Sequence, residues 1–457
     1  MNKHTICEFG EIRLNTDFGE KVGTDYSNNV LYLGKKPFRN LERFVLENQD
    51  PRNDKEPPLA LYTRQRKKRI KVKNYVGVLE TRDGSVIEIL PKIYSPIHMS
   101  VREVKKLFLR MLRCLSDPQY RILGTANLEA NESLPLLDVF IAEYVRECKE
   151  LIRKGLRADY TSAEENLSTV RGRILFSEQI RKNLAYKSRI FCKYSEHCRN
   201  TPRNRIIKST LEYLKSRSKN RKNLGALNAL LASMEDVAFS SDVEGDLRKC
   251  RVTSRLHSDY DNIIRVSEVF LTGRSLTCFS GDTMSAALLF PMEKVFEDYV
   301  ARQFKRHTDG YVVKTQRKGY FLVDYHNGSP MFGLRPDITM DRDNGGYHRI
   351  IIDTKWKIVD ESKKSSNYKI SQDDMYQMFA YGKKCSYKPE SDPILVLLYP
   401  RSESLNDKLP EFEYERKKLI LYVQPFDLCE NDTEQVVANI MRSVTDNIRS
   451  DKTGTSG

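Results

Sequence analysis

The 457-residue sequence predicts a multidomain α+β protein built from three regions. Short apolar runs separated by turn residues occupy residues 1–95, and apolar residues at three- and four-residue steps dominate residues 96–280. Both patterns mix over residues 281–430. We therefore expect a β-rich N-terminal region, a mostly helical middle region and a C-terminal domain with a mixed sheet flanked by helices. Residues 431–457 are expected to form a C-terminal helix and a disordered tail.

The N-terminal region contains the sequence of a hairpin. In NYVGVLETRDGSVIEILPKI, residues 74–93, two apolar runs flank Asp83-Gly84, a pair that favours a tight turn between antiparallel strands. Just before it, RQRKKRIKVK at 64–73 is the densest basic stretch, and its second half alternates basic and apolar residues. The basic positions of that half are Arg69, Lys71 and Lys73.

This alternation predicts a strand with a basic outer face. Such a face suits three roles, which are tracking a phosphate backbone, meeting an acidic protein surface, or forming a solvated edge strand. The net charge of +15 also favours a polyanionic partner, although a generally solvated basic surface has the same composition.

The middle region predicts amphipathic helices. Apolar residues recur on one helical face from Leu137 to Ile152, and Gly155 is expected to end that helix. A second helix is expected to begin in NTPRNRIIKSTLEYL, with Thr201 as its cap and Pro202 in its first position.

Composition points to a soluble cytoplasmic protein. The sequence contains no apolar run near the roughly 18–20 residues of a membrane span, and its N-terminus lacks the apolar stretch of a signal peptide. The nine cysteines are scattered, which suits reduced thiols better than a disulfide framework. The local cluster CKYSEHC has no second half at zinc-binding spacing, so we expect no structural zinc there.

The chemistry-bearing stretch is GLRPDITMDRDNGGYHRIIIDTKWKI, residues 333–358. Its triple isoleucine predicts a buried strand, after which Asp353 and Lys355 point to the same side because strand side chains alternate. Asp337 begins the preceding apolar run, and the turn-rich DRDNGG lies between the two runs. A hairpin would lay Asp337 beside Asp353 and Lys355.

Two close carboxylates repel each other unless a cation lies between them. Carboxylate oxygens with open positions suit Mg²⁺, with Mn²⁺ as an alternative ion. A neighbouring lysine can hold the attacking water and offset charge that builds on phosphorus. The pattern therefore indicates a metal-assisted in-line displacement at phosphorus.

These residues resemble the PD-(D/E)xK nuclease motif, formed here by Asp337 and Asp353-Thr354-Lys355. Upstream, the expected helix PMEKVFEDYVARQF carries Glu297, and downstream DMYQMFAYGKK carries Gln377 and Tyr381, similar to the QxxxY motif of RecB-like nucleases. The resemblance implies Asp337, Asp353 and Glu297 as metal ligands. It implies that the catalytic set comprises Asp337, Asp353, Lys355, Glu297, Gln377 and Tyr381.

A narrower resemblance covers most of residues 1–430. The segments NYVGVLET…SVIEILPKI, TVRGRILFSEQI, NTPRNRIIKSTLEYL and MEKVFEDYV, in that order, are similar to McrC, the nuclease subunit of McrBC-type restriction systems. The resemblance implies a cytoplasmic Mg²⁺-dependent endonuclease that cuts double-stranded DNA. It also implies an McrB-like AAA+ GTPase ring as the partner that this subunit stimulates, with the N-terminal β-rich region, including the basic strand, docking on the ring.

The chain itself lacks the GxxxxGK[ST] loop that would cradle nucleotide phosphates, so we expect no NTPase site in it. Two alternatives remain. One is a RecB-like DNA repair nuclease without a GTPase partner, and the other is a catalytically silent adaptor that only activates a GTPase. Extra residues near 40–60 and 215–260 make the chain longer than a compact McrC.

Overall fold

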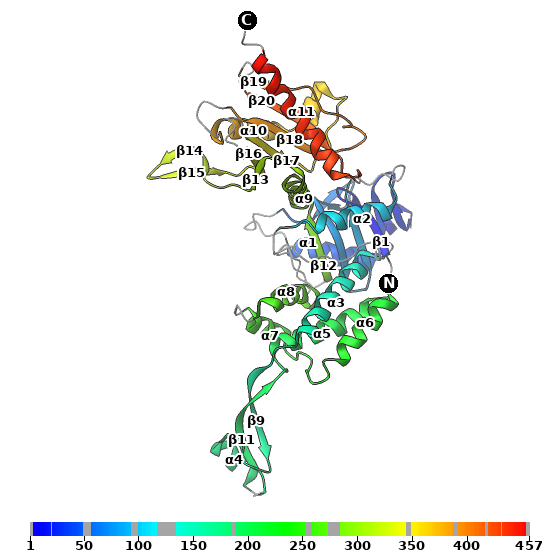
Figure 1. The fold of residues 1–457 in the computed structure, drawn as a ribbon. Coiled ribbons are helices and arrows are strands. Elements are labelled where there is room, and N and C mark those ends of the chain that lie inside the picture. Colours follow the sequence, from blue (N-terminus) through cyan, green and yellow to red (C-terminus); the bar gives the residue numbers. More distant parts are fainter. Residues whose placement is uncertain are drawn as a thin grey trace.

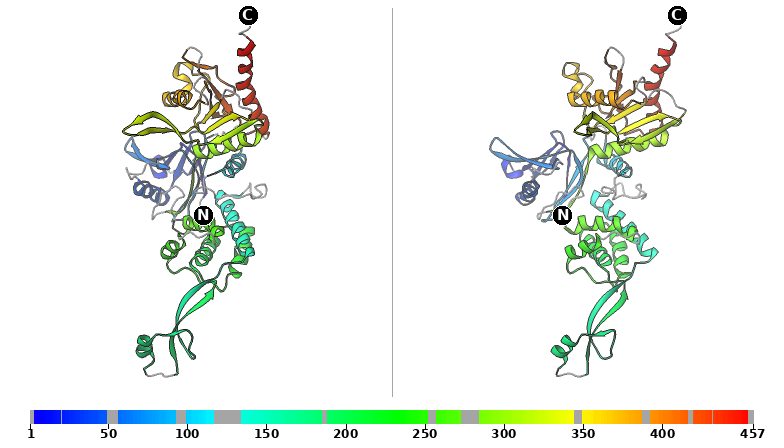
Figure 2. Two further views of the ribbon diagram at one scale, coloured as in Figure 1. Left: turned by 60° about the vertical axis from the view of Figure 1, so that its left-hand side comes forward. Right: turned by 90° about the vertical axis from the view of Figure 1, so that its left-hand side faces the viewer.

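The computed structural model gives an elongated molecule (Figures 1 and 2). The C-terminal strands and helices form one end, the N-terminal sheets lie in the middle, and a helical bundle leads to a narrow β arm at the other end. The structure describes residues 3–19, 21–48, 56–92, 99–116, 134–184, 188–251, 257–272, 284–343, 349–386, 392–415, 419–430 and 432–453.

Two sheets make up the N-terminal region. The first has the order β1-β8-β7-β12, with β1 at Lys3–Cys7, β7 at Tyr75–Thr81, β8 at Val86–Leu90 and β12 at Met284–Pro291. The second has the order β3-β4-β2-β6-β5, with β2 at Glu11–Leu14, β3 at Gly23–Asp25, β4 at Val30–Leu33, β5 at Leu59–Arg64 and β6 at Lys67–Val72. Helix α1, Lys35–Glu47, packs its apolar face into the core that both sheets share.

The predicted hairpin is confirmed, because β7 and β8 pair antiparallel around a turn in which Gly84 has a φ of 80°. The edge of that sheet was not foreseen. Strand β12 lies about 200 residues further along the chain, yet it pairs with β7 from Met284↔Thr81 to Pro291↔Tyr75. The N-terminal sheet is therefore completed by a segment that the sequence assigned to the C-terminal domain.

The basic strand is present, but one of its residues is not on an outer face. Ile70 and Val72 are fully buried, as the alternation predicts. Arg69 is only 5% exposed, with its Nη1 3.1 Å from Glu11 Oε2, so the expectation of an exposed basic side chain at this position is wrong. Arg69 is covered because Glu11 on β2 pairs with its guanidinium group, which also lies 5.6 Å from the centre of the Phe18 ring. Contacts of Arg69, Lys71 and Lys73 with DNA or a partner stay a prediction.

The middle region is a helical bundle with a β insertion. The helices of the bundle are α3 at Leu136–Lys154, α5 at Pro202–Arg217, α6 at Arg221–Ala232, α7 at Val243–Cys250 and α8 at Ser258–Thr272. Helix α2, Val101–Leu112, lies outside the bundle and packs against β8 and against helix α9, Met292–His307. Both helix predictions are confirmed. Gly155 follows α3 with a φ of 97°, and the Thr201 side chain accepts a hydrogen bond from Asn204 N at the start of α5.

The narrow arm was not predicted. Strands β9, Asp159–Leu167, and β11, Ile190–Cys198, pair antiparallel along their whole length, with β10, Arg173–Ile174, and helix α4, Phe176–Asn183, at the far end. CKYSEHC lies on β11, where its cysteines are free.

The C-terminal region contains a six-stranded mixed sheet of order β13-β16-β17-β18-β20-β19. Its strands are β13 at Tyr311–Thr315, β16 at Ile338–Arg342, β17 at Ile350–Thr354, β18 at Ile394–Pro400, β19 at Phe412–Tyr414 and β20 at Leu419–Phe426. Helices α9, Met292–His307, and α11, Thr433–Thr453, contribute to the core on one face, and α10, Gln372–Lys384, to the core on the other. A hairpin of β14, Tyr320–His326, and β15, Ser329–Leu334, projects from the sheet (Figure 1).

The predicted buried strand is confirmed as β17, and the packing explains its continuous apolar run. Ile350 and Ile352 belong to the core beneath α9 and α11, whereas Ile351 belongs to the core beneath α10. Because both faces of the sheet are covered, all three positions must be apolar. Among the helices of the described residues, none has both the length and the apolarity needed to span a bilayer. The expected C-terminal helix is confirmed as α11. The expectation of a disordered tail over SDKTGTSG, residues 450–457, is wrong for residues 450–453, which belong to α11, and residues 454–457 lie outside the described residues.

Candidate active site

The antiparallel pairing of β16 and β17 brings Asp337 close to Asp353. Ile338 pairs with Ile352, so Asp337 lies next to the end of β17. Asp337 Oδ2 accepts hydrogen bonds from the backbone N and the Oγ1 of Thr354, both at 2.8 Å. The sequence predicted this juxtaposition, and the strand register confirms it.

Asp353 and Lys355 lie on one side of the chain, as expected. Lys355 Nζ is 2.5 Å from Asp353 Oδ2, and the Asp353 side chain is almost completely buried. Burial raises the pKa of Asp353, although the ammonium group of Lys355 opposes this shift. Burial disfavours the charged form of Lys355, but the pairing with Asp353 outweighs it and raises the lysine pKa. Lys355 therefore stays protonated beside these carboxylates.

Glu297, on helix α9, is linked to Asp337 by Gln316, a residue that the sequence did not suggest. Gln316 Nε2 donates to Glu297 Oε1 at 2.8 Å and to Asp337 Oδ1 at 3.1 Å. Gln316 has a φ of 48°, in the left-handed region that non-glycine residues seldom adopt, and such strain gathers at functional sites. No motif marks Gln316, because it lies after β13 in the basic stretch KTQRK.

Gln377 and Tyr381 form a chain of hydrogen bonds between the two sides of the site. Lys355 Nζ donates to Gln377 Oε1 at 2.9 Å, and Gln377 Nε2 donates to the hydroxyl of Tyr381 at 2.8 Å. That hydroxyl donates to the backbone oxygen of Arg335, two residues before Asp337, at 3.0 Å. The i, i+4 spacing on α10 thus holds Lys355 and the approach to Asp337 in one arrangement.

The carboxyl groups of the site resist losing their protons together. Burial, and then the charge of Asp353, raises the pKa of Asp337 to about 7. Burial, and then the charge of Asp337, raises the pKa of Glu297 to about 7. Lys355 and Lys294 supply positive charge, with Lys294 Nζ 2.9 Å from Glu297 Oε1. Two lysines do not restore the usual acidity of these carboxyls, so a further cation would be stabilised here.

Mg²⁺ fits this donor set. No group of three or more His, Cys, Asp or Glu side chains lies at metal-binding geometry within the described parts of the chain. Mg²⁺ does not require such a cage, because it keeps several waters and takes one or two carboxylates together with substrate oxygens. Asp337 and Asp353 could provide those two carboxylates, and the charge of Glu297 acts on both of them.

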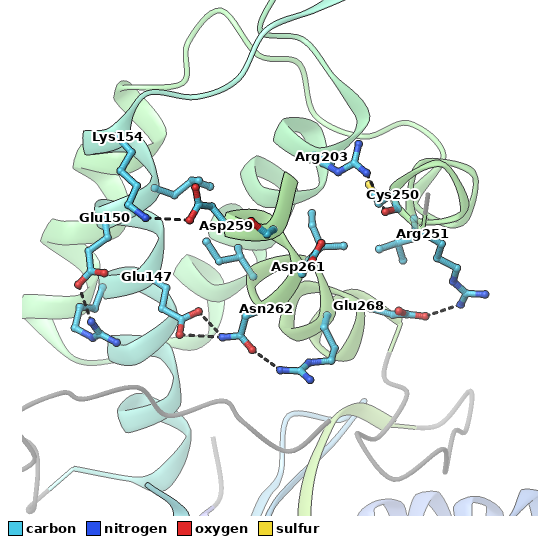
Figure 3. A pocket seen from close by; sticks show the side chains of 17 residues that line it. Glu147, Glu150, Lys154, Arg203, Cys250, Arg251, Asp259, Asp261, Asn262 and Glu268 are labelled. Carbon is cyan, nitrogen blue, oxygen red and sulfur yellow. Dashed lines mark hydrogen bonds and ion pairs between the residues drawn. The ribbon is translucent and has the colours of Figure 1, made fainter. Parts of the chain in front are cut away.

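A separate cavity of about 740 Å³ lies beside α3, α7 and α8 (Figure 3). Several of its charged side chains pair with one another: Lys154 Nζ is 3.0 Å from Asp259 Oδ1 (Figure 3), and Arg146 Nη1 is 2.7 Å from Glu150 Oε1. Because these charges already have partners on the wall, the cavity lacks the convergent, strained acid–base set found between α9, β17 and α10.

Comparisons with known proteins give one family and one shared fold. The model of a family described as "McrBC 5-methylcytosine restriction system component" matches residues 70–400. No curated protein matches the chain in sequence. The chain is similar to a chain in the "Refined half-complex from tetradecameric assembly of Thermococcus gammatolerans McrB AAA+ hexamers with bound McrC", with 17% identity and a TM-score of 0.63. That match covers 97% of this chain and 100% of the other. A "Cryo-EM structure of the Thermococcus gammatolerans McrBC complex" matches at 20% identity and a TM-score of 0.42, over 67% of this chain and 88% of the other.

Proposed function

Because the chain belongs to the family of McrBC 5-methylcytosine restriction system components, we propose that it is the DNA endonuclease subunit of an McrBC-like restriction complex. The observation that carries the proposal is the meeting of side chains from four separate elements at the end of β17. These are Glu297, Asp337, Asp353, Lys355, Gln377 and Tyr381. This set supports a nuclease centre of the PD-(D/E)xK type.

Each side chain has a role in phosphodiester hydrolysis. Asp337 and Asp353 would hold Mg²⁺ or Mn²⁺, with Glu297 beside them, and the ion would polarise a phosphate oxygen when bound. Lys355, kept charged by Asp353, orients the attacking water and offsets negative charge on the phosphate in the transition state. Gln377 and Tyr381 keep the ammonium group of Lys355 in position, which lowers the entropic cost of reaching that transition state.

We propose an McrB-like AAA+ GTPase ring as the partner. The fold shared with a chain from an assembly of "McrB AAA+ hexamers with bound McrC" supports this pairing, as does the family itself. The family assignment disfavours a repair nuclease that acts without a GTPase, and the paired acids and lysine disfavour a silent adaptor. Docking through the N-terminal β-rich region, with Lys71 and Lys73 at or next to β6, is part of this proposal.

Cleavage of supercoiled plasmid by the complex of this chain with its GTPase tests the proposal. Wild-type complex should cut with Mg²⁺ or Mn²⁺ and GTP, and should stop cutting in EDTA while the complex stays assembled. Asp353→Asn should remove cutting, because it removes charge from the buried carboxylate that faces Lys355. A rate loss of at least about a hundredfold is expected for such a transition-state contribution.

Asp343→Asn is the matched control. Asp343 follows β16 on the same hairpin, but its side chain is exposed and outside the site, so cleavage should be unchanged. Cutting by the Asp353→Asn complex at the wild-type rate, or undiminished cutting in EDTA, would refute the assignment of the nuclease centre.

A further inference from the structure

One buried carboxylate joins the N-terminal sheet to the catalytic strand. Glu8, directly after β1, is 1% exposed. Its Oε1 accepts a hydrogen bond from Trp356 Nε1 at 2.7 Å and another from the backbone N of Lys92 at 2.8 Å. Trp356 is the residue that follows Lys355, so Glu8 acts one residue away from the proposed catalytic lysine.

Lys92, two residues after the end of β8, binds the same tryptophan. Its Nζ donates to the backbone oxygen of Trp356 at 2.5 Å and lies 5.2 Å from the centre of the indole ring. Strands β1 and β8 are parallel neighbours, and Glu8 N donates to Leu90 O at 2.9 Å. Two adjacent strand ends of the N-terminal sheet therefore hold the side chain and the backbone of a single residue.

The other side of Trp356 contacts the catalytic domain. The ring of Phe296, on α9, lies 5.3 Å from the indole, and the next residue on that helix is Glu297. Trp356 thus lies between the N-terminal sheet and two elements that bear site residues. A shift of the sheet edge against α9 would move the backbone that carries Lys355.

The contacts of Glu8 and Lys92 with Trp356, called the Trp356 joint below, are polar, although an apolar contact would avoid burying charge. Glu8 Oε2 is buried and has no hydrogen-bond partner among the described residues, which is a cost that an apolar side chain would avoid. Burial raises the pKa of Glu8 to about 7, and burial lowers the pKa of Lys92 to about 8. A cavity of about 680 Å³ opens on Glu8, Lys92 and Trp356, which leaves room for another arrangement of the same groups.

We propose that Glu8 and Lys92 are positioning residues that hold Trp356, and through it Lys355, and that they transmit rearrangement of the N-terminal sheet to the nuclease site. This inference rests on the proposed function, because it assumes that Lys355 is catalytic and that the N-terminal region meets the GTPase. It adds the route by which the partner would control cutting.

The sequence supplies a probe for the joint, because Trp356 is the only tryptophan of the chain. Full-length protein labelled with 5-fluorotryptophan gives one ¹⁹F resonance, which reports the surroundings of this indole. Addition of unlabelled GTPase with GTP should shift that resonance. If the complex forms on a sizing column and the resonance does not move, the joint does not transmit and the inference is overturned. If no complex forms, the proposed function fails instead.

Cleavage by Glu8 variants gives the second test. Glu8→Ala removes the acceptor for Trp356 Nε1 and should lower kcat for plasmid cleavage roughly tenfold to a hundredfold, the scale expected from slight misplacement of a catalytic group. KM for DNA and GTP turnover should not change. Glu8→Gln keeps the side-chain oxygen and should recover most of the rate.

Glu47→Ala, an exposed carboxylate change at the end of α1, is the control and should cut like wild type. Equal losses in Glu8→Ala and Glu8→Gln, or wild-type cutting by Glu8→Ala, would overturn the positioning role. An Asp353→Asn complex that still cuts would instead refute the nuclease centre itself.

Discussion

Gln316 holds together two carboxylates that would otherwise repel. Its single amide nitrogen donates to both Glu297 and Asp337, so it fixes their separation without adding charge. A glutamine does this better than a lysine or an acid, because a charged group there would change the number of protons or cations that the site holds. Its left-handed backbone indicates that this placement is maintained against conformational strain.

Replacement of Gln316 should therefore impair cutting in a graded way. Gln316→Ala should slow plasmid cleavage about tenfold, because the two carboxylates lose their common donor. Gln316→Glu should slow it further, because a third negative charge joins Glu297 and Asp337. Gln372→Ala, an exposed change at the start of α10, serves as the control. Equal rates for Gln316→Ala and wild type would contradict this role.

The raised pKa values of Asp337 and Glu297 set the pH dependence of stability. Each pKa is about 7 in the folded chain, above its ordinary value near 4. Between these values the folded state binds more protons than the unfolded state, so the free energy of unfolding of the metal-free protein should fall as pH rises from about 4 to about 7. The loss should be on the order of a few kcal/mol.

Urea unfolding at several pH values measures this slope. Asp337→Asn removes one titrating group and relieves the repulsion on Glu297, so its slope should be clearly smaller. Mg²⁺ should raise the stability of the wild-type protein more at pH 8 than at pH 5, because only the ionised carboxylates bind it well. An identical slope in Asp337→Asn and wild type would count against the charge coupling.

Among the secondary-structure elements, the sequence predicted those whose burial or ends are marked by local residues. The run Ile350–Ile352 implied a strand covered on both faces, and the caps at Thr201 and Gly155 marked real helix ends. The arm was missed because β9, DYTSAEENL, is rich in polar residues and no tight turn joins it to its partner β11, from which 22 residues separate it. Its pairing depends on contact between strands, which local pattern does not encode.

Strand β12 could not be assigned to the N-terminal sheet either, because its pairing with β7 also depends on contact between distant strands. One glycine, however, is required by that pairing. Gly77 on β7 has a φ of 142°, and a Cβ added there would lie 2.0 Å from the backbone oxygen of Leu288 on β12. The close approach of the two backbones therefore requires glycine at this position.

Gly77→Ala should destabilise the protein by roughly 2–4 kcal/mol through backbone strain and overpacking. Gly225→Ala is the matched control, because Gly225 lies within α6 with open space around its Cα, and alanine there should stabilise by roughly 0.5–1 kcal/mol. Denaturant unfolding of both variants measures the contrast. A Gly77→Ala protein as stable as wild type would mean that β7 and β12 do not meet as described.

Across the chain as a whole, the order of the motifs predicted which residues form the candidate site. It said less about how the chain divides into structural regions. All six expected site residues meet, because the upstream Asp, DxK, QxxxY and Glu297 are tied to two strands and two helices of fixed geometry. The expected boundary near residue 281 does not separate two cores, because one continuous core contains Val76, Phe290 and Val437. The four-stranded N-terminal sheet and the six-stranded C-terminal sheet share this core, which gives a partner bound to one sheet a physical route to the other.

The proposed function requires that this chain cut DNA at a site distinct from the surface that engages its GTPase. The most direct measurement is a single reaction in which the complex of GTPase and the Lys355→Ala chain is assayed for plasmid cleavage and for GTP turnover. Lys355 contacts Asp353 and Gln377, and neither of these two residues belongs to the N-terminal sheets. We predict that cleavage falls by about a hundredfold or more while GTP turnover stays at the wild-type level. Cleavage at the wild-type rate would show that Lys355 does not belong to a nuclease centre.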